Sequence, residues 1–176
     1  MKKVQFITQA AVIAALYVVL TLLANALGLA NYAIQVRFSE ALTILPFFTP
    51  AAIPGLFIGC IISNILGGCI IWDIIFGSIA TLIGAVGTYL IAHLAHKQPE
   101  ASKTSNLIHE ICCTLPPIAA NTIIIPFVLA YAYLFEGGVP YFMLTVGIGE
   151  IISCGILGFL LLQVLKKYRN QIFKQD

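Results

Sequence analysis

Long apolar runs separated by short polar stretches make up most of this chain. Residues 4–36, 41–72, 74–96 and 111–135 contain no Lys, Arg, Asp or Glu, and a last apolar run at 140–165 contains only Glu150. A helix needs about 20 apolar residues to cross a bilayer, so every run is long enough to do so. The pattern predicts a membrane protein built from helices.

The second run is too long for one helix. As a continuous helix, residues 41–72 would measure about 48 Å, whereas the hydrocarbon core is about 30 Å thick. Pro46, Pro50 and Pro54 lie in or near its first half, and each removes a backbone donor and bends the chain. We therefore expect a short piece at about 39–50 followed by a helix at about 52–66, which gives six spans in all.

Composition supports the same class. Hydrophobic residues make up 60% of the 176 residues, charged residues 9%, and the mean hydropathy is +1.01. A water-soluble domain of this composition would expose far too much apolar surface. We expect one integral membrane domain over residues 1–176, multi-pass in the cell membrane. The chain has no phosphate-binding loop and no nucleotide-binding signature, so any energy source must come from elsewhere.

The basic residues predict the orientation. Eight of the nine Lys and Arg residues form three clusters, and the positive-inside rule places such clusters on the cytoplasmic side. Six spans satisfy the rule with both termini cytoplasmic, whereas five would leave the C-terminal cluster outside. The clusters are Lys2 and Lys3; Lys97 and Lys103; and Lys166, Lys167, Arg169 and Lys174.

A set of polar residues maps to the outer half or the middle of this bundle, whereas we expect almost no buried polar group in the cytoplasmic half. Ionisable groups inside a membrane are costly and usually functional, so the set predicts an outward-facing pocket. Glu150 is the most costly, because it lies about 14 Å along a helix that starts near residue 141. The set is Arg37, Glu40, Asn64, Asp73, Asn121 and Glu150.

Some of these residues also have a purely structural explanation. Arg37 and Glu40 could form an interfacial ion pair that fixes where a helix enters the membrane, and Glu150 could merely pair with Arg37. Trp72 could belong to the interfacial aromatic belt. The sequence alone does not decide between these explanations.

The polar set suits a flat, donor-rich ligand. A carboxylate can accept two parallel hydrogen bonds from a guanine-like edge, and an amide can serve a carbonyl. Tyr32, Trp72 or Tyr89 could stack on a flat ring. We expect no metal centre at the three histidines, which lack nearby ligands, and no cofactor. No nucleophile lies near a base in the sequence.

Small residues mark the first helix. Ala10 with Ala14, and Ala11 with Ala15, lie four residues apart. Such spacing leaves a shallow groove in which another helix can approach closely. The groove could serve packing within the bundle or contact with a partner.

The proline-rich stretch and the residues after it closely resemble the QueT family of queuosine-precursor transporters, over nearly the whole chain. The residues that carry the resemblance are 36–55, Asn64, Gly67, Gly68, 73–78 and Glu150.

This resemblance implies a substrate-binding subunit, or S component, of an energy-coupling factor transporter. Such a subunit is a bundle of six transmembrane helices that captures its ligand on the outer side. It associates with a membrane T component and two cytoplasmic ATPases, docking through alanines spaced four apart in the first helix. It then topples in the membrane, driven by ATP hydrolysis in its partners. The implied substrate is a 7-deazaguanine such as preQ1, preQ0 or queuine.

Other functions remain open from the sequence. The chain could be an S component for another flat vitamin. A stand-alone secondary transporter would tend to show inverted repeats, and we find no convincing repeat. An intramembrane enzyme would need a base and nucleophile, or metal ligands, in one cavity.

Overall fold

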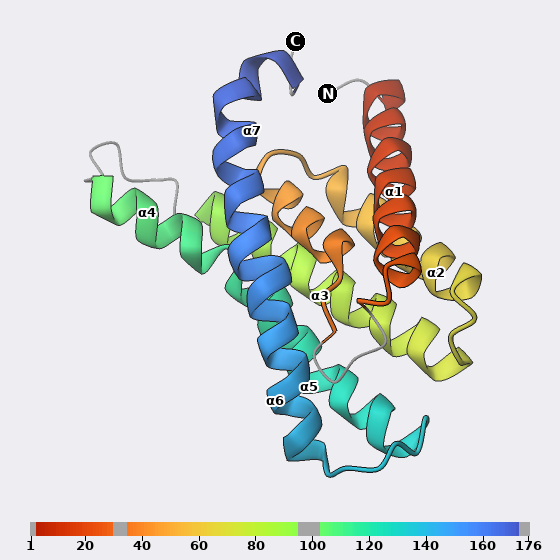
Figure 1. Ribbon diagram of the computed structural model, residues 1–176. Helices are drawn as coiled ribbons and strands as arrows, with labels where there is room; N and C mark the ends of the chain where they lie inside the picture. Colours follow the sequence, from red (N-terminus) through yellow and green to blue (C-terminus); the bar gives the residue numbers. More distant parts are fainter. Residues whose placement is uncertain (1–2, 30–34, 95–102, 173–176) are drawn as a thin grey trace.

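The computed structural model describes residues 3–29, 35–94 and 103–172, and this part of the chain is helical without strands (Figure 1). The elements are α1 Lys3–Ala26, η1 Phe38–Phe47, α2 Ala52–Leu66, α3 Ile71–Leu94, α4 Lys103–Cys112, α5 Leu115–Tyr131, α6 Val139–Glu150, η3 Ile151–Leu157 and α7 Gly158–Ile172. Four helical stretches are long and apolar enough to cross a membrane: Lys3–Ala26, Ile71–Leu94, Thr104–Tyr131 and Val139–Arg169. The prediction of an all-α membrane protein is confirmed.

The proline-rich stretch is divided as predicted. A 3₁₀-helix, η1, runs over Phe38–Phe47 with Pro46 inside it, and α2 then covers Ala52–Leu66. Two turns join them, since the amide of Ala52 donates to the carbonyl of Thr49 at 3.2 Å. The first piece differs from the expectation of residues 39–50, because it is wound more tightly and ends three residues earlier.

The η1 segment lies at the centre of the bundle. It contacts α1, α2, α3, η3 and α7. Most of its side chains are buried, including the polar Ser39, Glu40 and Thr43. Glu40 thus enters the core because a short, tightly wound segment is surrounded by longer helices.

The structure also differs from the sequence-based expectation in the segment before α5. We expected a loop at 97–106 and one apolar span at 111–135, whereas residues 103–112 form α4 and the helix starts again at Leu115. Pro116 and Pro117 occupy the first turn of α5, where a missing amide does no harm. They also pack on α3, where a methyl group added to Gly84 would lie 2.7 Å from Pro117. The prolines therefore start a helix rather than bend one.

The last span changes its winding. Helix α6 passes through a π-helical segment, η3, into α7 without a gap. The wide turn contains Ser153 and Cys154, which are both about 1% exposed. The start of α1 and the end of α7 lie at the same end of the bundle (Figure 1).

Helices α1 and α2 pack with their backbones close together. A methyl group added to Gly55 would lie 2.7 Å from the Ala10 carbonyl oxygen, and one added to Gly59 would lie 3.0 Å from that of Ala14. Ala14 is buried as a result. The two alanine pairs are therefore not equivalent, since Ala10 and Ala14 face α2 whereas Ala11 and Ala15 are exposed. Backbone atoms of Ala10 and Ala14 thus pack against α2 within the bundle, the alternative that the sequence left open, so Ala11 and Ala15 are the better candidates for a partner interface.

Candidate functional site

A cavity of about 600 Å³ lies at the end of the bundle opposite the start of α1 and the end of α7. The ends of α1, α2 and α5, the starts of α3 and α6 and the segment before η1 form its walls. Arg37 and Asp73 are the two charged residues among the described residues that line it. The other polar side chains include Asn25, Gln35, Tyr133 and Thr145, and the aromatic ones include Phe135, Tyr141 and Phe142.

Asp73 is held from α3 toward one wall. The residue is 5% exposed, and the hydroxyl of Tyr133 donates a hydrogen bond to Asp73 Oδ2 at 3.1 Å. The same hydroxyl oxygen accepts from the amide of Ile70 at 3.4 Å. Burial, and next the Asp73 carboxylate, raise the pKa of Tyr133 above its ordinary value, so the phenol stays protonated and continues to donate. Burial and Asp73 likewise raise the pKa of the Cys69 thiol on the cavity wall.

Arg37 enters the cavity from the extended segment before η1. Its Nη2 donates to Gln35 Oε1 at 3.4 Å, and its backbone amide donates to Ser153 Oγ at 3.1 Å. This segment crosses α6 at Gly149, where an added methyl group would lie only 2.2 Å from the Gln35 carbonyl oxygen. Arg37 makes no ion pair with any described residue. The interfacial pairing with Glu40 and the pairing with Glu150 that the sequence left open are therefore absent.

Glu40 and Glu150 form a deeper, closed cluster. The hydroxyl of Tyr17 donates a short hydrogen bond to Glu40 Oε1, and Asn121 Nδ2 donates to Glu40 Oε2 at 3.5 Å. The thiol of Cys154 donates to Glu150 Oε2 at 3.1 Å. Glu40, Glu150 and Cys154 each offer one potential ligand atom within 4.8 Å of the others. In this structure, the Glu40 and Glu150 carboxylates and the Cys154 thiol are hydrogen-bonded mainly to other residues of the cluster.

A narrow space separates the two parts of the site. It measures about 10 Å³ and is lined by Gln35, Arg37, Asn121 and Glu150, together with two apolar residues that also line the outer cavity. That volume holds about one water molecule. A ring-sized ligand therefore fits the outer cavity and reaches Glu150 only if Arg37 and Gln35 move.

The remaining predicted residues lie apart from the cluster. Asn64 is 3% exposed and donates to the Asp73 carbonyl at 3.5 Å, so it fixes the turn between α2 and α3 beside the cavity. Trp72 is 54% exposed and stacks on Phe76 in a separate apolar groove between α3 and α5. Tyr32 falls outside the described residues.

Tyr89 lies at the far end of α3. Its ring stacks on His93 with centroids 4.1 Å apart. Sixteen residues of α3 separate it from Asp73, or about 24 Å of helix. Neither Tyr89 nor Trp72 can stack on a ligand in the outer cavity as the helices are arranged here.

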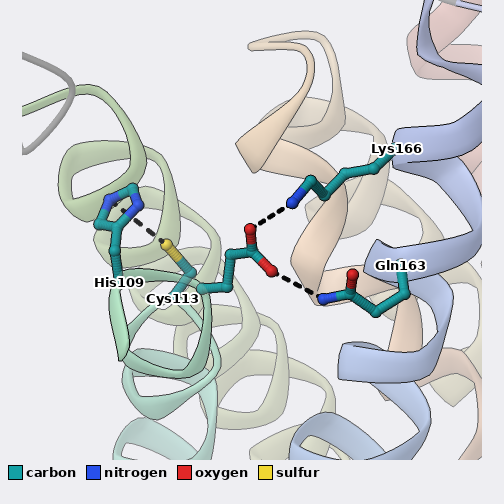
Figure 2. Close-up of polar contacts among 5 residues, drawn as sticks. His109, Cys113, Gln163 and Lys166 are labelled. Atoms are coloured by element: carbon teal, nitrogen blue, oxygen red, sulfur yellow. Dashed lines mark hydrogen bonds and ion pairs between the residues drawn. The ribbon is translucent and has the colours of Figure 1, made fainter. Parts of the chain in front are cut away.

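Tyr133 and Glu110 are two polar residues that the sequence pattern did not predict. Tyr133 follows α5, and no spacing in the sequence links it to Asp73. Glu110 on α4 is 6% exposed, and its carboxylate pairs with Lys166 and accepts from Gln163 Nε2 at 2.7 Å. Figure 2 shows Lys166 and Gln163 reaching this carboxylate from α7. The end of the bundle that the sequence predicts to be cytoplasmic therefore contains a buried ion pair, contrary to the expectation that this half has almost no buried polar group.

His109 and Cys113 lie at the same end of the bundle as Glu110 (Figure 2). His109 Nε2 lies 2.9 Å from the Ile91 carbonyl, and Cys113 Sγ lies 4.0 Å from the same nitrogen (Figure 2). The first contact joins α4 to the end of α3, and the second lies between α4 and the residue that follows it. These polar contacts thus tie α3, α4 and α7 together.

Comparison with known proteins gives one result. A family model described as QueT transporter matches residues 7–167, which is most of the chain. Searches of curated proteins and of solved structures find no match.

Proposed function

Because the chain belongs to the QueT transporter family, and so to a family of membrane transporters, we propose that it is the substrate-binding S component of an energy-coupling factor transporter. It captures a queuosine precursor of the 7-deazaguanine class from outside the cell. A membrane T component and two cytoplasmic ATPases then drive uptake, and this chain hydrolyses no ATP itself.

The observation that carries the proposal is the cavity that contains Arg37 and Asp73. Its volume of about 600 Å³ falls within the range of about 300–1,000 Å³ that is usual for small-molecule sites. Carboxylate and guanidinium groups can each make two parallel hydrogen bonds, so they suit the donor and acceptor edges of a guanine-like ring. Tyr141 and Phe142 offer aromatic surface to its faces.

Six passes with both termini cytoplasmic would make this cavity face outward. The four long spans and the two shorter apolar segments, Phe38–Phe47 and Ala52–Leu66, provide the required elements. The start of α1 and the end of α7 share one end of the bundle (Figure 1), and exposed basic residues of α7 lie there. The cavity lies at the opposite end.

The T component would dock on the exposed alanines of α1. Ala11 and Ala15 lie on a face that also exposes Val12, Leu16 and Val19, and small residues in such a face permit close helix contact. Replacing both Ala11 and Ala15 by Trp should abolish co-purification with the T component and leave ligand binding intact. Trp at Ile123, a position on α5 that is 57% exposed, is the matched control. Normal co-purification of the double variant would exclude this docking face.

Ligand screening of the purified chain tests the proposed substrate. We expect 7-deazaguanines to raise the thermal unfolding temperature, since a ligand that binds only the folded state stabilises it. Purine nucleobases and flat vitamins form the comparison set. Stabilisation by a vitamin instead would reassign the chain to another S-component specificity. Substrate uptake by reconstituted chain alone, without ATPases, would identify a secondary transporter.

A further inference from the structure

Opposite charges face one cavity without pairing with each other. Among the described residues, the one ion pair within 4 Å is Lys166 with Glu110, at the other end of the bundle. Arg37 and Asp73 both line the outer cavity, and each is hydrogen-bonded to a neutral side chain, Gln35 and Tyr133 respectively.

Such an arrangement is costly without a ligand. A charge removed from water loses free energy unless an opposite charge or several hydrogen bonds replace the water. Asp73 is only 5% exposed, and the neutral hydroxyl of Tyr133 donates to its carboxylate. Arg37 attracts Asp73 electrostatically without contacting it, so a cationic group entering the cavity would give this carboxylate a direct charged partner.

The deeper acids, Glu40 and Glu150, are poorly placed to bind a cationic group in the outer cavity. Both oxygens of Glu40 accept hydrogen bonds from Tyr17 and Asn121, and the space beside Glu150 holds about one water. Asp73 is therefore the carboxylate that a ligand in the outer cavity meets first.

We propose that Asp73, oriented by Tyr133, selects ligands that bear a cationic substituent such as a primary ammonium, while Arg37 binds an acceptor such as the ring carbonyl. Asp73 contacts the ligand, and Tyr133 is a positioning residue because it acts through Asp73. This inference rests on the proposed function and specifies which members of the substrate class bind tightly.

The test compares two ligands that share one ring. 7-Aminomethyl-7-deazaguanine carries an ammonium group, whereas 7-cyano-7-deazaguanine carries a neutral nitrile. Isothermal titration of the purified full chain gives the ratio of their dissociation constants. A charge-assisted hydrogen bond predicts that the amine binds at least about tenfold more tightly.

Variants then locate the origin of that ratio. Asp73→Asn keeps the shape of the side chain and should bring the ratio close to one while the nitrile still binds, which also shows that the variant folds. Tyr133→Phe should lower the ratio in part. If Tyr133 had only a structural role, this variant would weaken the binding of both ligands equally and leave the ratio unchanged. Glu136→Gln changes an exposed acid beyond the cavity lining and should leave the ratio unchanged.

Each outcome decides a separate point. Equal binding of the two compounds by the parent chain, or an unchanged ratio in Asp73→Asn, would overturn the selection by Asp73 and leave the proposed function standing. If Asp73→Asn fails to fold, an unchanged ratio in Tyr133→Phe overturns the orienting role. If neither compound binds the parent chain, the proposed substrate class itself is wrong.

Discussion

The close contact between Gly149 and Gln35 makes a sharp prediction about how the cavity is held. A methyl group in Gly149→Ala would lie 2.2 Å from the Gln35 carbonyl oxygen. Carbon and oxygen atoms in contact are normally at least about 3.3 Å apart, so the two segments must separate by about 1 Å. The displaced segment includes Arg37 and Gln35, which line both the outer cavity and the narrow space beneath it.

The magnitude depends on two opposing effects. Overpacking costs about 1–3 kcal/mol, and replacing Gly by Ala within a helix returns about 0.5–1 kcal/mol. We expect a net destabilisation of about 1–2 kcal/mol, which lowers the unfolding temperature of a chain of this size by roughly 2–8 °C. Ligand affinity should fall as well, because Arg37 moves with the segment.

Gly155→Ala is the matched control. It lies on the same continuous span, where an added methyl group would meet Ile118 at an ordinary 3.6 Å. Thermal unfolding in detergent and ligand titration, run on both variants, should separate them clearly. Equal stability and equal affinity of the two variants would refute the close crossing of the segment over α6.

Two further predictions concern helix packing. Lys166→Met should destabilise the protein by about 1–2 kcal/mol, because it leaves the buried Glu110 carboxylate without its cation; the cost is moderated because Lys166 is itself 41% exposed. Lys167→Met, on the exposed face, should have little effect in the same thermal unfolding assay. Equal effects of the two variants would refute the role of the ion pair. Ala14→Leu should lower the unfolding temperature because Ala14 packs against Gly59, whereas Ala11→Leu should not. A lower unfolding temperature for Ala11→Leu than for Ala14→Leu would place α2 on the other face of α1.

The sequence predicted those parts of the fold that depend on local chemistry. The prolines near residue 50 predicted the break before α2, because a proline removes a donor wherever it lies. The same reasoning applied to Pro116 and Pro117 could have predicted the start of α5, since paired prolines favour the first turn of a helix. That boundary is therefore a local signal as well, although we expected one continuous span there.

The site was predictable only in part. Scarcity of charge identified Arg37, Asp73 and the two deeper acids, because polar groups in a membrane segment are rare. Which of them share a cavity depends on contacts between residues far apart in the chain, such as Tyr133 with Asp73. No spacing along the chain contains that information.

The π-helical turn at Ile151–Leu157 has a consequence for how this span can tolerate change. A π-helical turn is closed by i→i+5 hydrogen bonds and holds one residue more than an α-helical turn, so removing one residue here would leave a continuous α-helix in which α6 and α7 keep close to their present orientations. Lys166 would then still face Glu110 while Glu150 kept its position. The wide turn therefore accommodates one extra residue in this span, and a single-residue deletion within Ile151–Leu157 should be tolerated far better than one within α6 or α7.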